Sequence, residues 1–407
     1  MPDDAALSTV AVGGIGVVLA LGGMLIGRMT LVTLSAAALV AGSVVSSGAA
    51  HASVLPRPGG EFAVGTTVLR LADQARPDPF RPERTRELMV SVFYPAVDAD
   101  KHPQAHYVST SLLPELEKRA GVQLPGLLTN AHTEAPARTG ESYPVVLFSP
   151  GAGVMRLWSN GLAEDLASRG YVVVTIDHTY ETAVEFPGGR IVEPKLFPEF
   201  SQEVRRQYLD ARMADTRLVL DSMVQLAHGT NPDADRHALP AGLDRVLDLE
   251  RIGMAGHSLG GYVAVESMHA DRRIDAAVDL DGQIGIDEDF GRSVIEGVDR
   301  PVLVMTSEQI EQVGDANPSL EAFWQRGTGW KRQLTMQGSA HYDFTDMPVL
   351  IPDAARPAAK TYVGPIAAER SSTLVRTYVA AMFDQFLRDR PTPILNHPTH
   401  QEITALR

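Results

Sequence analysis

The segment IGMAGHSLGG, residues 252–261, decides the fold of this chain. Its apolar first half ends in Gly-His-Ser-Leu-Gly, and residues 262–268 continue as a segment compatible with a helix. A strand, a tight turn and a helix around Gly-x-Ser-x-Gly are typical of a nucleophile elbow, in which a strained turn exposes the serine hydroxyl. Glycines at 256 and 260 leave room for the turn, and the helix N-terminus offers N–H groups to an oxyanion. We therefore predict that Ser258 is a nucleophile.

The composition, net charge and lack of cysteine exclude several classes of binding partner and of catalytic site. The chain has 407 residues, of which 44% are hydrophobic and 21% charged, as in an ordinary globular protein. Its formal net charge of −14 argues against nucleic acid or an anionic membrane as an electrostatic partner. Because the chain has no cysteine, disulfides, thiolate catalysis and cysteine-ligated metal sites are excluded.

The N-terminal segment predicts the compartment. Between residues 8 and 50 the only charged residue is Arg28, and the apolar run that follows ends in Ala50-His51-Ala52, a pattern typical of signal-peptide cleavage sites. We expect residues 1–52 to be a signal peptide or N-terminal hydrophobic segment, with cleavage after Ala52 and export of the protein. The alternative is a membrane anchor, because residues 10–26 are long enough to cross a bilayer.

The remainder of the chain alternates between strand and helix patterns. Residues 53–60 are rich in Pro and Gly and are expected to be a linker, and residues 61–407 are expected to form one catalytic domain. Strands that alternate with helices predict an α/β fold with a mostly parallel central sheet and helices on both faces. The expected strands are 66–71, 86–95, 143–148, 171–176, 252–255, 274–280, 301–305 and 330–336, and the expected helices are 155–168, 204–226, 262–268 and 371–388.

A polar insertion precedes the regular part of the chain. Residues 111–119 and 124–128 contain leucines between charged and turn-forming residues. This stretch could form a short helix beside the site and make transient contact with a lipid surface. An ordinary surface insertion is the favoured explanation of the pattern.

The serine needs a histidine base, and position selects one. The histidines downstream of Ser258 are His269, His341, His397 and His400. The first lies on the elbow helix, too close in sequence to reach back, and the last two lie in a Pro-rich tail. Only His341 follows a predicted strand, where partners of such a serine are found. We therefore predict His341 as the base.

Two carboxylates compete for the role of the acid that orients the base. Asp281 ends the strand after the elbow and is followed by Gly282, whereas Glu308 follows the next strand. Asp279 lies on the same strand face as Asp281 but deeper in the sheet. Spacing and exposure favour Asp281, with Glu308 as the alternative.

The oxyanion hole needs two backbone donors. One is the N–H after the nucleophile, at Leu259. The second is expected from the loop Ser149–Gly153, where glycines allow the backbone to approach a substrate. We assign it to Ala152, with Gly151 as the alternative.

Together these motifs resemble the plasma-type platelet-activating factor acetylhydrolase family of α/β-hydrolases. The residues that carry the resemblance are 92–95, 147–153, 256–261, 278–282, 307–308 and 340–344. The resemblance implies an α/β-hydrolase fold, with Asp281 as the acid and Glu308 at a non-catalytic position. Two residues depart from the family pattern: Pro150 replaces a typical histidine, and Leu259 replaces a frequent aromatic residue. Both border the acyl pocket, so phospholipid specificity does not carry over.

The sequence thus predicts a secreted serine ester hydrolase, a carboxylesterase or lipase that forms an acyl-enzyme. Its expected substrate is a small-molecule or lipid ester, with the short acyl chains of lipids as one option, and its chemistry needs neither a metal ion nor an organic cofactor. Two alternatives are a cell-envelope acyltransferase with the same triad and a catalytically degenerate, exported binding protein. Acyl-chain length and oligomeric state are not encoded in any recognisable pattern.

Overall fold

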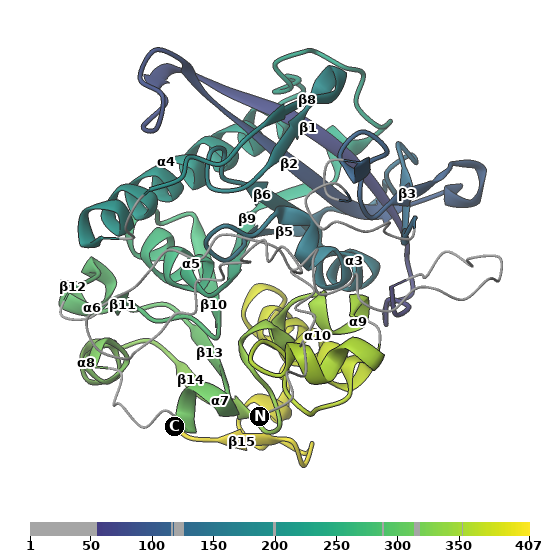
Figure 1. The fold of residues 1–407 in the computed structure, drawn as a ribbon. Coiled ribbons are helices and arrows are strands. Elements are labelled where there is room, and N and C mark those ends of the chain that lie inside the picture. The colour runs from purple at the N-terminus through teal and green to yellow at the C-terminus, as the bar shows by residue number, and fades with distance from the viewer. Residues whose placement is uncertain are drawn as a thin grey trace, which may run out of the picture.

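The computed structural model describes residues 55–114, 117, 126–197, 201–286, 289–312, 318–351 and 353–407. Within these residues one mixed sheet of eleven strands crosses the molecule (Figure 1). In sheet order the strands are β15 (Ile403–Ala405), β14 (Lys331–Met336), β13 (Val302–Ser307), β10 (Ile274–Leu280), β9 (Leu247–His257), β5 (Tyr143–Ser149), β6 (Val172–Asp177), β2 (Thr85–Ala96), β1 (Ala63–Pro77), β4 (Leu128–Thr133) and β3 (Gln104–His106).

The central strands run parallel. From β6 through β5, β9, β10 and β13 to β14, every neighbouring pair is parallel, so their carboxyl ends meet at one edge of the sheet. The early strands β1 and β2 pair antiparallel, as the sequence predicts. Two short hairpins lie outside this sheet, β7 (Val184–Phe186) with β8 (Arg190–Val192) and β11 (Gly285–Ile286) with β12 (Asp289–Phe290).

Helices cover both faces of the sheet. The described helices are α3 (Asn160–Ser168), α4 (Gln202–Ala227), α5 (Leu259–Ala270), α6 (Arg292–Glu296), α7 (Glu308–Gln312), α8 (Pro318–Arg326), α9 (Met347–Leu350) and α10 (Ala368–Leu387). Figure 1 shows α4 and α5 on one side of the sheet and α3 and α10 on the other. This architecture confirms the predicted α/β-hydrolase fold.

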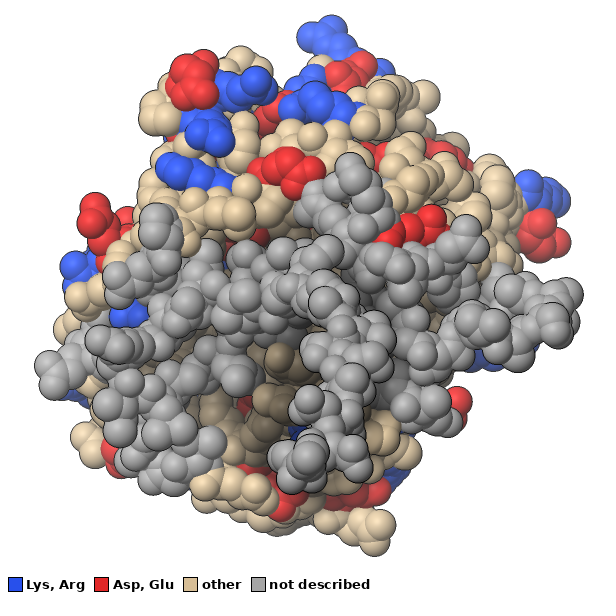
Figure 2. All heavy atoms as spheres, viewed as in Figure 1, with Lys and Arg blue, Asp and Glu red and all other residues tan. Residues whose placement is uncertain are grey.

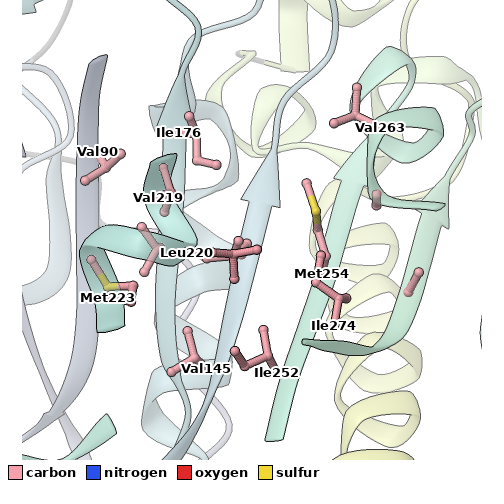
Figure 3. Close-up of a cluster of buried hydrophobic side chains, with 14 of the residues drawn as sticks. Val90, Val145, Ile176, Val219, Leu220, Met223, Ile252, Met254, Val263 and Ile274 are labelled. Carbon is pink, nitrogen blue, oxygen red and sulfur yellow. The ribbon is translucent and has the colours of Figure 1, made fainter. Parts of the chain in front are cut away.

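Side-chain alternation along the strands produces two cores. Val145 on β5 and Ile252 on β9 belong to the core beneath α4, where Leu220 also lies (Figure 3). Val146 and Phe148 point to the opposite face and pack in the core beneath α3 and α10. Because parallel strands in the middle of a sheet are buried on both faces, they consist of continuous apolar runs.

Three strands of the main sheet, β3, β4 and β15, were not predicted from the sequence patterns. Trp330–Met336 was expected to be the last strand, but β15 adds antiparallel to β14 as the edge of the sheet. Three residues are too few to show a period-two pattern of apolar side chains. The strand β15 also follows a Pro-rich stretch, which was interpreted as an irregular C-terminal tail.

Of the predicted N-terminal hydrophobic segment and linker, the structure describes only part of the linker. The expected hydrophobic segment 1–52 lies outside the described residues, as do residues 118–125 of the polar insertion. Residues 55–60, expected to belong to a linker, pack against α3: the N–H groups of Gly59 and Gly60 donate to side chains of Asp165 (2.7 Å) and Ser168 (2.9 Å). Among the described helices, none is both long and apolar enough to cross a membrane.

On the visible part of the surface that is not grey, acidic and basic side chains are interspersed (Figure 2). Some of the ion pairs among the described residues are exposed, such as Arg272 with Asp299 and Arg292 with Glu296. Such pairs contribute little to stability, roughly 0–1 kcal/mol each.

Candidate active site

Ser258 occupies a strained turn between β9 and α5. Its backbone has φ 56° and ψ −124°, a conformation that a residue with a side chain rarely adopts. The neighbouring glycines explain how the turn is accommodated. A Cβ atom on Gly256 would lie 2.0 Å from the Gly260 carbonyl oxygen, and one on Gly260 would lie 1.9 Å from the Ser149 carbonyl oxygen. Neither position can carry a larger residue without moving the backbone.

Asp281 and His341 meet at the same edge of the sheet. The Asp281 Oδ2 atom lies 2.7 Å from His341 Nδ1. The buried carboxylate also accepts hydrogen bonds from the Ser307 backbone N–H (2.6 Å) and the Ser307 hydroxyl (3.1 Å). These two donors take the place of the water that burial removes. With Nδ1–H donated to Asp281, the tautomer leaves His341 Nε2 free to accept a proton.

Glu308 lies elsewhere. It begins α7, and its carboxylate accepts a hydrogen bond from the Gly338 N–H at 2.6 Å. Of the two carboxylates considered from the sequence, the structure therefore places Asp281 against His341 and uses Glu308 to hold the loop that leads to it.

His257, the residue before Ser258, contacts the backbone of His341. Among the described residues, no hydrogen bond links the Ser258 hydroxyl to His341, and such bonds often tighten only when substrate is bound. His257, which precedes the serine, lies 2.9 Å through Nε2 from the His341 carbonyl oxygen, and the two rings are 4.5 Å apart. Burial, and then the proximity of His341, lower the pKa of His257 well below its ordinary value. A neutral His257 thus donates Nε2–H to the His341 carbonyl oxygen.

Asp343 fixes the loop that carries His341, a role that the sequence did not reveal. Its Oδ2 atom accepts the N–H groups of Ala340 (2.7 Å) and Gly364 (2.6 Å). Burial raises the pKa of Asp343 to about 6. The only sequence signal was its place two residues after the histidine, since Gly364 is distant in sequence.

The candidate oxyanion donors lie on the two segments that the sequence indicated. Within the described part of the chain, the N–H groups of Leu259 and Ala152 have no hydrogen-bond acceptor. The loop that contains Ala152 lies against the elbow, because a Cβ on Gly151 would be 3.4 Å from the Ser258 Cβ. Two N–H groups without partners, one at a helix N-terminus, form a site suited to an oxyanion.

Aromatic side chains pack beside the histidine. Tyr342 makes edge contacts with Trp158 and Tyr362, each with ring centroids 6.1 Å apart. This cluster is a candidate apolar wall for the substrate.

One group in the described residues has the geometry to hold a metal ion, Asp233, Asp235 and His237. It lies in the loop between α4 and β9, and none of its members belongs to the site around Ser258. Asp235 is already paired with Arg70 at 2.6 Å.

The sequence also matches a known family. The model of "Platelet-activating factor acetylhydrolase, isoform II" covers residues 48–362. The chain belongs to this family. The match spans Ser258, Asp281 and His341 and therefore confirms the resemblance seen in the motifs.

Individual relatives agree with the family assignment. A probable 1-alkyl-2-acetylglycerophosphocholine esterase of Arthroderma benhamiae is 28% identical over 89% of this chain and 95% of its own. A platelet-activating factor acetylhydrolase of Bos taurus is 25% identical over 72% of this chain and 68% of its own. Among solved structures, a ferulic acid esterase from Streptomyces cinnamoneus has a TM-score of 0.73 and 35% identity, covering 88% of this chain and all of that one. The chain is accordingly an ester hydrolase.

The two carboxylates can be separated by matched substitutions. Asp281→Asn should lower kcat by roughly 10³–10⁴, because an amide beside His341 Nδ1 no longer holds the required tautomer or stabilises the imidazolium. Glu308→Gln should change kcat by less than about threefold, since Gln can still accept from Gly338. Steady-state hydrolysis of p-nitrophenyl acetate measures both, and the opposite ranking would make Glu308 the acid.

Asp279 generates a prediction on pH and stability. This carboxyl is buried on β10 and accepts the Gly282 N–H at 2.9 Å, while its Oδ2 has no partner among the described residues. Burial raises its pKa to about 8. Because the unfolded chain ionises near pH 3.9, the proton held in the fold stabilises it fully below that pH, and this stabilisation is lost as pH rises to about 8.

Asp279→Asn removes this titration. The free energy of unfolding of the variant, minus that of the wild type, should increase by a few kcal/mol between about pH 4 and pH 8 and then level off. Urea unfolding over this pH series measures the difference, with the exposed Asp100→Asn as the control. A difference that does not change with pH would show that Asp279 ionises alike in the folded and unfolded states.

Proposed function

We propose that this esterase is a serine carboxylesterase with Ser258 as nucleophile, His341 as general base and Asp281 as the acid that orients it. The observation that carries the proposal is the 2.7 Å contact between Asp281 and His341, at the sheet edge where β9 delivers the strained Ser258. The site then contains the three roles of a Ser-His-Asp triad in the chain order found in α/β-hydrolases.

The proposed reaction has two halves. The Ser258 hydroxyl oxygen attacks the ester carbonyl carbon while His341 Nε2 takes the hydroxyl proton, and the N–H groups of Leu259 and Ala152 hold the oxyanion. The intermediate collapses, the C–O bond to the alcohol breaks, and His341 returns the proton to the leaving oxygen. Water then attacks the acyl-enzyme with His341 again as base, which releases the acid and restores Ser258.

Burial of Asp281 supports this chemistry electrostatically. The positive charge that His341 acquires in each half-reaction forms next to a carboxylate that is already held by two donors from Ser307. That carboxylate need not reorient, which is the condition for efficient electrostatic stabilisation.

Two classes of acyl group have support. Relatives named as esterases of an acetylated glycerophospholipid favour a short acyl chain on a lipid or small alcohol. The solved ferulic acid esterase favours an aromatic acyl group instead, and the aromatic cluster of Trp158, Tyr342 and Tyr362 beside His341 offers a surface for it. We propose a short-chain carboxylic ester as the substrate, with an aromatic ester as the second candidate.

The nucleophile is tested by Ser258→Ala. Hydrolysis of p-nitrophenyl acetate should fall in kcat by about 10⁶, because the covalent route is lost. Circular dichroism must show the variant to be folded, and a rate equal to that of the wild type would refute the proposed nucleophile.

The wild-type enzyme, assayed with p-nitrophenyl esters from acetate to decanoate and with methyl ferulate, ranks the two acyl classes by kcat/KM.

We also propose that residues 1–52 form an export segment cleaved after Ala52, so that the enzyme acts outside the cytoplasm on esters it meets there. The apolar run and the Ala50-His51-Ala52 pattern support this proposal. Expression of the full chain in an exporting bacterial host should yield soluble enzyme in the medium or periplasm that begins at Ser53 by N-terminal sequencing. An intact N-terminus in the membrane fraction would instead indicate an anchor.

A further inference from the structure

Arg212 is a buried arginine that holds the backbone of the proposed oxyanion loop. It lies on α4 with only 1% of its surface exposed. One Nη atom lies 2.5 Å from the Pro150 carbonyl oxygen, and the other lies 3.0 Å from the Gly151 carbonyl oxygen. Glu181, equally buried, accepts from its Nε (3.0 Å) and Nη2 (2.6 Å). Two consecutive peptide groups are thus gripped by one planar guanidinium.

This grip determines where the N–H groups of the loop point. In a planar trans peptide the C=O and the following N–H point in opposite directions. A Gly151 carbonyl directed at Arg212 therefore directs the Ala152 N–H away from α4. The other side of the loop is the elbow, since a Cβ on Gly151 would lie 3.4 Å from the Ser258 Cβ. The guanidinium also polarises these carbonyls, which strengthens the opposite N–H groups as donors.

A second Ser-His-Asp chain supports the same loop from below. The Ser149 hydroxyl lies 3.0 Å from His178 Nε2, and His178 Nδ1 lies 3.0 Å from Asp215 Oδ2. Its hydrogen-bond order is that of a catalytic triad, yet all three residues are buried and no ester can reach Ser149. Arg212 donates to the Ser149 hydroxyl at 3.3 Å, so the chain ends on the arginine that holds the loop.

The surroundings of His178 and Asp215 favour a neutral imidazole and an ionised carboxylate. Burial, and then the charge of Arg212, lower the pKa of His178, which is therefore neutral and accepts a hydrogen bond from the Ser149 hydroxyl at Nε2. Although burial opposes ionisation of Asp215, the charge of Arg86 and the hydrogen bonds from His178 and Arg86 lower its pKa below the ordinary value. The series of hydrogen bonds from Arg212 through Ser149 and His178 thus ends at the Asp215 carboxylate, which also accepts from Arg86 at 2.6 Å.

We propose that Arg212, paired with Glu181 and tied to the Ser149-His178-Asp215 chain, is a positioning residue that sets the orientation of the Ala152 N–H in the oxyanion hole. The inference rests on the proposed function of Ser258 and of the Leu259 and Ala152 donors. Arg212 touches no substrate atom. It acts through the two peptide planes that it holds.

The test compares two arginines that grip backbone carbonyls. Arg212→Lys keeps a charge for Glu181 but loses the fork that holds Pro150 and Gly151 together. Arg300→Lys is the matched control, because Arg300 holds carbonyls of Met268 and Ile274 at the opposite end of α5 and β10. Arg212→Lys should lower kcat for p-nitrophenyl acetate about 10²-fold with KM within about threefold, as expected when an oxyanion donor is misplaced. Arg300→Lys should leave kcat within about threefold.

A transition-state analogue provides the readout that a purely structural role would not change. A phenethyl trifluoromethyl ketone forms a tetrahedral adduct with the serine, so its inhibition constant should rise in Arg212→Lys by the factor by which kcat/KM falls. A folded Arg212→Lys enzyme with unchanged kcat and inhibition constant would overturn the inference, while an inactive Ser258→Ala keeps the proposed function intact. An active Ser258→Ala would instead refute that function.

A second variant covers the case in which Arg212→Lys does not fold. Arg212→Gln combined with Glu181→Gln removes both charges together, so no buried ion is left unpaired. It should show the same losses in kcat and analogue affinity with KM retained. If neither variant folds, Arg212 has a structural role alone and the inference is wrong.

Discussion

The close approach of Gly260 to the carbonyl oxygens of Ser149 and Pro150 is the constraint on which the site depends. A Cβ at this position would lie 1.9 Å from the first oxygen and 2.6 Å from the second. The approach brings the first turn of α5 against the loop after β5, and these two segments supply the two N–H groups without acceptors. Any residue larger than glycine would separate them, so the elbow and the loop form one unit.

The sequence could predict the parts of the site that follow strands. Ser258, Asp281 and His341 were each found as a residue after an apolar run, and parallel strands bring their carboxyl ends to one edge. Spacing, exposure and the family resemblance favoured Asp281 over Glu308, and the structure places Asp281 against His341. Arg212 could not be predicted at all, since its partners lie 31 to 63 residues away and an arginine in a helical pattern is normally exposed.

The buried ions beneath the loop are costly, and stability alone does not explain them. Arg86, Arg212, Asp78, Asp215 and Glu181 are all almost fully excluded from solvent. Well-packed apolar residues often serve a fold as well as or better than buried ion pairs. What apolar side chains cannot do is hold two successive carbonyls in fixed directions. For Arg212, which contacts the carbonyl oxygens of Pro150 and Gly151, burial of the charge is therefore best understood as a requirement of geometry.

Chemistry and specificity are separated in this fold. The groups proposed to contact the reacting ester are held by β5, β9, β10 and the loop after β14, all of them anchored in the sheet. The side chains that would contact an acyl group, such as Trp158 and Tyr362, come from connecting segments, which can change without disturbing the strands. Such a separation would allow one fold to serve both a relative named for an acetylated glycerophosphocholine and a structural neighbour named for ferulic acid.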